Sequence, residues 1–331
     1  MDEPTSYFDR VISRQRPAWV QISVSLLLLL LPFIIAYLSN VPGEMYTNGN
    51  WRYFLLTPAI IIYIWLISPL VDRQSKEVVR SLQALSTLDE ESFSALSKKA
   101  QRTHPRSEWI AIGVGMTFGL VINSANDFSG IGMLFQVYFT VSLATMYGML
   151  AWVIYGSVIN TRMVNALFRQ PLRVNIFNPA PFEAVGRMSL MLAMVFIGGI
   201  TLSLVLSFRV TSLTQPLFWL IYLMLVLTTL LIFFSSMRPA HRLLEKNKDA
   251  ELSDVRRHLE RLGQELLLCI DRQEETSTIA SEINALGIYE QRLQGARTWP
   301  YNTGTLRTLF FSVLMPLGSV VVKMVMDIVL E

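Results

Sequence analysis

The organisation of the chain is decided by residues 217–271, which read LFWLIYLMLVLTTLLIFFSSMRPAHRLLEKNKDAELSDVRRHLERLGQELLLCID. The first part carries no charge before Arg238 and is long enough to cross a bilayer core of about 30 Å. The residues after Arg238 are highly charged and keep a helical pattern. The stretch therefore predicts a membrane span that runs directly into a cytoplasmic helical module.

The composition excludes an ordinary soluble domain. Of the 331 residues, 52% are hydrophobic and only 16% are charged, which is typical of a multi-span membrane protein. The formal net charge is +3, so the positions of Lys and Arg carry more information than their sum. A single cysteine, Cys269, excludes an intrachain disulfide.

The other apolar runs predict an all-α membrane protein with six transmembrane helices and a cytoplasmic helical layer. The predicted order is an N-terminal interfacial helix (1–18), spans one and two (19–71), a cytoplasmic helical hairpin (72–108), spans three and four (109–158), a cytoplasmic linker (159–187), spans five and six (188–237), a second cytoplasmic helical hairpin (238–303) and a C-terminal membrane-associated helix (304–331). A frayed tail explains residues 1–18 equally well.

Two of these segments carry further local signals. In the 72–108 hairpin, Thr87 and Glu90 have the spacing of a capping box, which predicts the start of the second helix there. Pro316 and Gly318 interrupt the last apolar run. Because such residues break or kink helices, residues 304–331 fit a seventh span, a re-entrant helix or an interfacial helix.

Basic residues orient the spans. Seven Lys and Arg lie in residues 72–108 and four in residues 159–187, against one, none and one in the three loops on the opposite side. Cytoplasmic loops of membrane proteins carry the excess of Lys and Arg. We therefore expect a multi-pass protein of the plasma (inner) membrane with its N-terminus in the cytoplasm.

The charged module has the apolar pattern of a helical hairpin. A first seam alternates steps of three and four residues, as in a coiled coil, and a second stripe follows the polar run DRQEETS. Two antiparallel helices joined near residues 271–277 explain this pattern. A seam of this length is more often used for packing within one chain than for a long oligomeric coil. Its residues are Leu252, Val255, Leu259, Leu262 and Leu266, continuing to Cys269.

Small and polar residues recur at four-residue spacing in spans three and four. Ala111, Gly115 and Gly119 predict a close approach of two helix backbones. The corresponding stripe in span four has two interpretations, which are the lining of a pore and interhelical hydrogen bonding with close packing. It consists of Gln136, Thr140, Ala144 and Gly148.

Lys323 and Asp327 are further candidates for pore lining. They lie one helical turn apart and can pair on one face. If the last segment spans the membrane, these charges must face a cavity or a neighbouring subunit. If the segment lies at the interface, they face water.

Two motifs in the second half of the chain resemble a known pattern. NIFNPAPF at Asn175–Phe182 precedes a predicted span, and TWPYNTGTLR occupies Thr298–Arg307. Together they resemble a group of uncharacterised prokaryotic multi-pass membrane proteins in which a TWPW…TLR box follows a cytoplasmic helical hairpin. Tyr301 stands where that pattern has a second tryptophan. The resemblance carries no assigned chemistry, so it implies no functional residue.

The sequence offers no enzyme motif. His104, His241 and His258 are scattered and Cys269 lies on an apolar stripe, so neither metal-ligand spacing nor a catalytic dyad is present. Phosphate-binding glycine motifs are missing. Basic residues alternate with acids, which is typical of solvated helices and not of nucleic-acid binding. We expect no catalysis, no cofactor, no metal site and no nucleic-acid partner.

Two functional hypotheses remain. Central portions of the spans hold no ionisable residue, which disfavours proton-coupled transport because a relay needs such groups at depth. The first hypothesis is an oligomeric ion channel or passive pore in the lipid bilayer, regulated by the cytoplasmic helices, and we expect a homo-oligomer since closed homo-oligomers are common. The alternative is a non-transporting sensor or scaffold whose cytoplasmic layer recruits a soluble partner.

Overall fold

The computed structural model describes residues 17–39, 51–101, 105–124, 132–170, 174–178, 180–207, 216–299 and 307–312, and the single positions 43, 172, 304 and 318. Within these residues the protein is 89% helix and has no strand, which confirms the all-α fold class. Almost all of the N-terminal helix predicted for residues 1–18 lies outside the described residues, as do Lys323 and Asp327.

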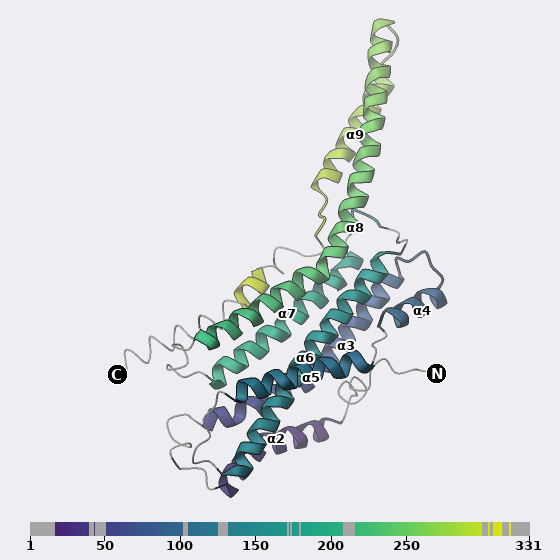
Figure 1. Ribbon diagram of the computed structural model, residues 1–331. Helices are drawn as coiled ribbons and strands as arrows, with labels where there is room; N and C mark the ends of the chain where they lie inside the picture. The colour runs from purple at the N-terminus through teal and green to yellow at the C-terminus, as the bar shows by residue number, and fades with distance from the viewer. Residues whose placement is uncertain are drawn as a thin grey trace.

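Eight helices with assigned bounds form a bundle and a projecting arm (Figure 1). Their bounds are α2 Ala18–Leu38, α3 Trp51–Gln83, α4 Glu90–Gln101, α5 Pro105–Asn123, α6 Met133–Phe168, α7 Ala180–Ser207, α8 Pro216–Asp271 and α9 Ser277–Gly295. We use "arm" for residues 240–271 of α8 together with α9, and "bundle" for the other helices with the first part of α8. Figure 1 shows α9 lying along α8 in the arm, away from the bundle.

Five of the described helices are long and apolar enough to cross a membrane, namely α2, α3, α6, α7 and α8. The predicted third span corresponds to α5, which is 19 residues long and is not one of the five. Its first turn holds Arg106 and Glu108, so its apolar part is short. The structure therefore shows five candidate spans where the sequence predicts six.

Helix α3 continues across a boundary that the sequence placed between a span and a cytoplasmic segment. The second span and the first helix of the 72–108 hairpin form one helix, α3, which contains Pro58 and Pro69. The second helix, α4, begins at Glu90 and is capped by Asp89, whose Oδ2 accepts a hydrogen bond from Ser92 N at 3.0 Å. The capping residue is thus Asp89 and not Thr87, and the bonds from Ser92 hold the pKa of the Asp89 carboxyl below its usual range.

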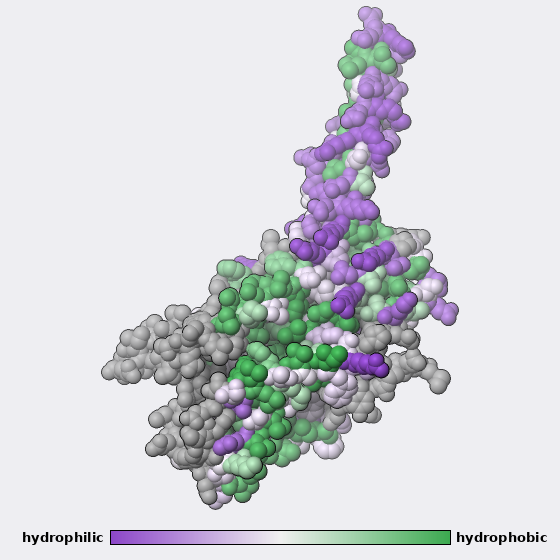
Figure 2. Space-filling view, viewed as in Figure 1, coloured by the Kyte–Doolittle hydropathy of each residue, from purple (hydrophilic) through white to green (hydrophobic). Residues whose placement is uncertain are grey.

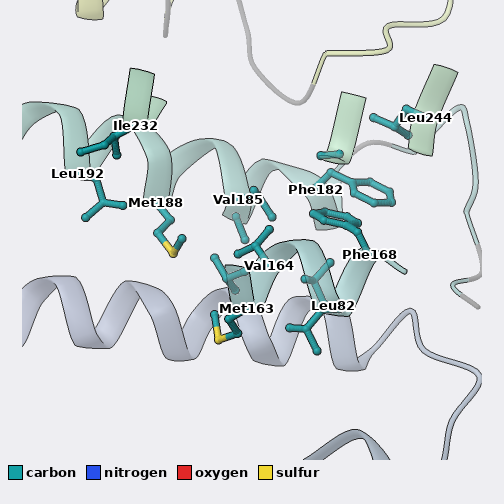
Figure 3. Packing of buried hydrophobic residues seen from close by; sticks show 14 of the residues in the cluster. Leu82, Met163, Val164, Phe168, Phe182, Val185, Met188, Leu192, Ile232 and Leu244 are labelled. Atoms are coloured by element: carbon teal, nitrogen blue, oxygen red, sulfur yellow. The ribbon is translucent and has the colours of Figure 1, made fainter. Parts of the chain in front are cut away.

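The largest hydrophobic core lies at the arm end of the bundle (Figure 3). It joins the C-terminal turns of α3 and α6, the start of α7, the middle of α8 and one face of α4. Phe168 of α6 stacks on Phe182 of α7, with ring centroids 5.9 Å apart. The labelled members are Leu82, Met163, Val164, Phe168, Phe182, Val185, Met188, Leu192, Ile232 and Leu244. This core fixes the point from which the arm leaves the bundle.

The bundle exposes apolar side chains and the arm exposes polar ones (Figure 2). Leu27 of α2 and Val114 of α5 are 60% and 65% exposed. A soluble monomer rarely exposes so much contiguous apolar surface, whereas a lipid environment requires it. The distribution is consistent with a bundle embedded in a membrane and an arm outside it.

Candidate functional site at the base of the arm

Helix α8 changes direction where it leaves the bundle, as Figure 1 shows. Pro239 lies inside the helix at this point, immediately after Arg238. Proline has no N–H to donate to the carbonyl of Ser235, and its ring crowds that carbonyl. Pro239 is therefore the local cause of the bend.

The chain that follows α9 crosses α8 beside this bend. The Trp299 ring stacks on the His241 ring with centroids 3.9 Å apart and planes 10° from parallel. His241 Nδ1 lies 3.3 Å from Thr298 O, and Nε2 lies 3.7 Å from Glu245 Oε2. His241 is thus held from two sides, by the aromatic segment and by its own helix.

The C-terminal end of α9 is fastened to α8 by Lys248. Its Nζ donates hydrogen bonds to Gln294 O at 2.7 Å and to Ala296 O at 3.0 Å. Both carbonyls lie at the end of α9, where backbone acceptors have no helical partner and the helix dipole attracts a cation. Lys248 therefore closes the hairpin at the end nearest the bundle.

A second segment, residues 174–178, also packs on this end of the hairpin. Ile176 is buried with Leu252, Val255 and Leu293. Phe177 contacts the Tyr289 ring at a centroid distance of 5.6 Å, and the Arg292 guanidinium lies 5.5 Å from the Phe177 ring centroid. The connection between α6 and α7 thus supports both arm helices.

Two polar pairs also join the arm helices near these contacts. Arg256 Nε donates to Glu290 Oε1 at 2.8 Å, and this bond is the main cause that holds the pKa of the Glu290 carboxyl below its usual value. The Tyr289 hydroxyl donates to Glu251, and that bond raises the pKa of the phenol because an ionised phenolate would face a carboxylate. The arm base is thus held by apolar, aromatic and charged contacts.

After Trp299 the chain returns to the bundle. Leu309 is 4% exposed and packs with Ala193 and Ile197 of α7 and with Phe233 and Met237 of α8. Trp299 belongs to the same cluster. Trp299 of the TWPY…TLR segment and Leu309 just beyond it therefore pack against α7 and α8 in one cluster.

The structure places the predicted seam residues between the arm helices. Leu252, Val255 and Leu262 are buried, and Leu259 packs against the same cluster as Leu293 of α9. Leu266 is partly exposed. The turn between the helices covers residues 272–276, inside the predicted 271–277.

The small residues of α5 face α6. A Cβ added at Gly115 would lie 2.4 Å from Tyr147 O, and one added at Gly119 would lie 3.1 Å from the Cα of Ala144. Ala111, the third predicted packing residue, is partly exposed. The backbones of α5 and α6 are therefore closer than any larger residue at Gly115 would permit.

Three residues of the stripe predicted as pore lining, Thr140, Ala144 and Gly148, lie against α5 of the same chain. Thr140 Oγ1 accepts a hydrogen bond from Asn123 Nδ2 at 2.9 Å and donates to Gln136 O at 2.8 Å. Ala144 approaches Gly119, and a Cβ added at Gly148 would lie 2.9 Å from Met116 Cγ. The contacts of these residues are those of interhelical packing, one of the two interpretations of the sequence.

A buried carboxyl in α5 was missed by sequence reasoning. Glu108 is 2% exposed and accepts a hydrogen bond from Trp152 Nε1 of α6 at 2.8 Å. The available signal was its position in the first helical turn, where the free N–H groups and the helix dipole favour an acid. The pairing with Trp152, 44 positions away, has no local sequence signal.

The far end of the arm exposes large apolar side chains. Leu267, Leu268 and Ile270 in the last turns of α8 are 63%, 55% and 54% exposed. They lie beyond the seam, next to the turn that leads to α9. We call these three residues the arm tip.

Comparison of the chain with models of protein families, with curated proteins and with solved structures found no match. The resemblance of Asn175–Phe182 and Thr298–Arg307 to a group of multi-pass membrane proteins therefore stays a prediction. What the structure adds is a position for residues of each segment, since Ile176 and Phe177 of the first and Trp299 of the second pack at the base of the arm.

Proposed function

We propose that the protein is a non-transporting membrane sensor or scaffold whose arm recruits a soluble partner. The observation that carries this proposal is the arm tip, where Leu267, Leu268 and Ile270 are exposed together at the end of a hairpin whose surface is mostly polar. A helix rises about 1.5 Å per residue, so the tip lies roughly 45 Å along α8 from Pro239. At that reach the partner that covers these side chains is a soluble protein and not the bilayer.

The membrane arrangement completes this proposal. We infer that α5 crosses the membrane as a sixth span beside α6, with the arm and the N-terminus in the cytoplasm of a plasma membrane. The antiparallel packing of α5 on α6 and the distribution of basic residues support this orientation. The arm then stands in the cytoplasm, where soluble partners are available.

The channel hypothesis is the second candidate. It requires a homo-oligomer with a water-filled path. The sequence feature that supported it was the stripe from Gln136 to Gly148. Contacts of Thr140, Ala144 and Gly148 with α5 of the same chain give the scaffold the stronger support. Single-channel recording of the purified protein tests the candidate, and currents that respond to voltage or tension would favour it.

Site-specific photocrosslinking in intact cells tests the scaffold proposal. A photoreactive amino acid at Leu267 or Ile270 is expected to give one discrete adduct with a soluble protein. The same probe at the exposed Glu260, on the polar part of the arm, is the matched control and should give less of that adduct. Leu268→Gln should weaken the adduct formed at Ile270. Equal labelling at Glu260, or adducts with lipid or a second copy only, would contradict recruitment through the tip.

A further inference from the structure

Side-chain hydrogen bonds mark one level at which the bundle changes from apolar to charged. Thr161 Oγ1 of α6 lies 3.0 Å from Ser236 Oγ of α8, and Ser75 Oγ of α3 donates to Asn160 Oδ1 at 3.2 Å. The first charged residues of α6 and α8 follow within two positions, at Arg162 and Arg238. This level is where phospholipid headgroups meet a membrane protein.

Two cations on the α3 and α7 side of this level, Lys76 and Arg187, are neutralised by the protein itself, whereas Arg80 of α3 is exposed and forms no ion pair with another residue that the structure describes. Lys76 Nζ lies 2.7 Å from Asp72 Oδ2. Arg187 lies 2.8 Å from Glu77 Oε1 and 4.0 Å from Glu183 Oε2. On this side the acidic partners come from the same two helices.

Cations on the α6 and α8 side have no such partners. Arg162, Arg169, Arg238 and Arg242 are exposed, and none forms an ion pair with another residue that the structure describes. Arg162 and Arg169 lie seven residues apart and share one face of α6, and Arg238 and Arg242 share one face of α8. Most of the uncompensated charge at this level therefore lies on α6 and α8.

The exposed faces of α6 and α8 lie on one side of their contact. Both helices run toward the arm, since Leu167 and Leu244 lie in the same core cluster beyond the Thr161–Ser236 contact. Each residue of a helix is rotated about 100° from the one before. Thr161 and Ser236 point toward each other. Counted from these two residues, the rotation places Arg162 and Arg242 on the same side of the contact between α6 and α8.

Helix α5 leaves this side of α6 open below Arg162. The Trp152–Glu108 hydrogen bond places the first turn of α5 at the level of Trp152, roughly 15 Å below Arg162 along α6. Val158 lies one turn below Arg162 and is 41% exposed, although it belongs to an apolar span. A short apolar surface of α6 thus ends one turn beneath the unpaired Arg162, on the side of the contact to which Arg242 also turns.

We propose that Arg162 and Arg242 bind the phosphate headgroup of an anionic lipid whose acyl chain lies against Val158. Guanidinium groups bind phosphate oxygens through charge-assisted, often bidentate hydrogen bonds. The apolar surface below the cations identifies the source as a bilayer lipid and not a free phosphate. Basic side chains between membrane helices on the cytoplasmic side are the setting in which such headgroups are held.

The test is retention of anionic lipid by the full-length protein. Protein reconstituted in phosphatidylcholine vesicles that contain a minor fraction of phosphatidylglycerol is extracted mildly, and the retained anionic lipid is counted by native mass spectrometry. Removing one such cation is expected to weaken binding roughly fivefold, so Arg162→Gln/Arg242→Gln should weaken it by about 25-fold. Both side chains are exposed, so the variant should keep the wild-type unfolding temperature.

The matched control is Lys76→Gln/Arg187→Gln, which removes the same charge from two cations that the protein itself neutralises. It should retain lipid as the wild type does. An equal loss in the control would overturn the proposal, because a general surface potential would then explain the binding. Unchanged retention by Arg162→Gln/Arg242→Gln would also overturn it, as would displacement of the lipid by inorganic phosphate alone.

Discussion

Tyr63 of α3 occupies the space that a side chain at Gly198 of α7 would need. A Cβ added at Gly198 would lie 2.2 Å from the phenolic oxygen of Tyr63. The same hydroxyl donates a hydrogen bond to Val195 O at 2.8 Å. The missing side chain at Gly198 therefore allows α3 and α7 to approach and to share a partly buried hydrogen bond.

Gly198→Ala should destabilise the bundle by about 1–3 kcal/mol, because the new methyl group forces α3 and α7 apart or displaces Tyr63. Thermal unfolding in detergent measures the effect. Gly199→Ala is the matched control, since its Cβ would lie 3.6 Å from Tyr63 Cε1, an ordinary contact. Combining Gly198→Ala with Tyr63→Phe should recover part of the loss. Equal unfolding temperatures for the two alanine variants would show that the approach is not limited at Gly198.

Gly115→Ala should separate α5 from α6. Its Cβ would lie 2.4 Å from Tyr147 O and 2.6 Å from Ala151 Cβ, and a backbone oxygen cannot move without moving its helix. We expect faster hydrogen exchange throughout α5 and a lower unfolding temperature. Gly113→Ala enters open space on the same helix and, since alanine favours helix, should be neutral or slightly stabilising. Slow exchange in both variants would contradict a close helix contact at Gly115.

The fold class and the arm hairpin could be predicted from the sequence because their signals are local. Apolar runs of membrane length and a seam with steps of three and four residues each fix one element. Helix α3 shows the limit of this reasoning, because its continuation past Pro69 depends on Val78 and Leu82 being buried in the core shared with α6 and α7. Tertiary packing there outweighs a local signal for a break.

The contacts at the base of the arm could not be predicted either, because they too depend on tertiary packing between residues that are distant in the chain. His241 and Trp299 stack although 58 positions separate them in the chain, and Phe177 reaches Tyr289 from a different connection. A periodic pattern in the sequence does not indicate which aromatic rings, distant from each other in the chain, pack together. The sequence singled out residues 298–307 but did not predict where they lie in the fold. The structure places Trp299 of this segment beside α8.

Lowering the pH should loosen α9 from α8. The pKa of the Glu290 carboxyl is held below its ordinary value of 4.5, chiefly by the hydrogen bond from Arg256. A lowered pKa contributes stability that is present above 4.5 and is lost as the pH falls through the lowered value. Hydrogen exchange of α9, measured as the pH is lowered through this range, should therefore increase beyond its intrinsic pH dependence.

Glu290→Gln separates this contribution from general acid effects. The variant cannot titrate at this position, so its α9 protection should change less over the same range. The pair is exposed, so the difference should be small and should shrink as salt is added. An identical pH response in the variant and the wild type would assign the loosening to other groups.

Trp299→Ala should free the arm to move relative to the bundle, because its ring is stacked on His241 beside the Pro239 bend and also belongs to the cluster with Leu309. Pulsed electron resonance between spin labels measures this motion. One label is placed on the arm with Arg261→Cys and one on α5 with Ser107→Cys, after Cys269→Ser removes the native thiol. The distance distribution should broaden in Trp299→Ala. Trp19→Ala, which removes a 70% exposed tryptophan from α2, should leave it unchanged. A distribution of the same width in Trp299→Ala and the wild type would mean that α8 alone, despite Pro239, sets the direction of the arm.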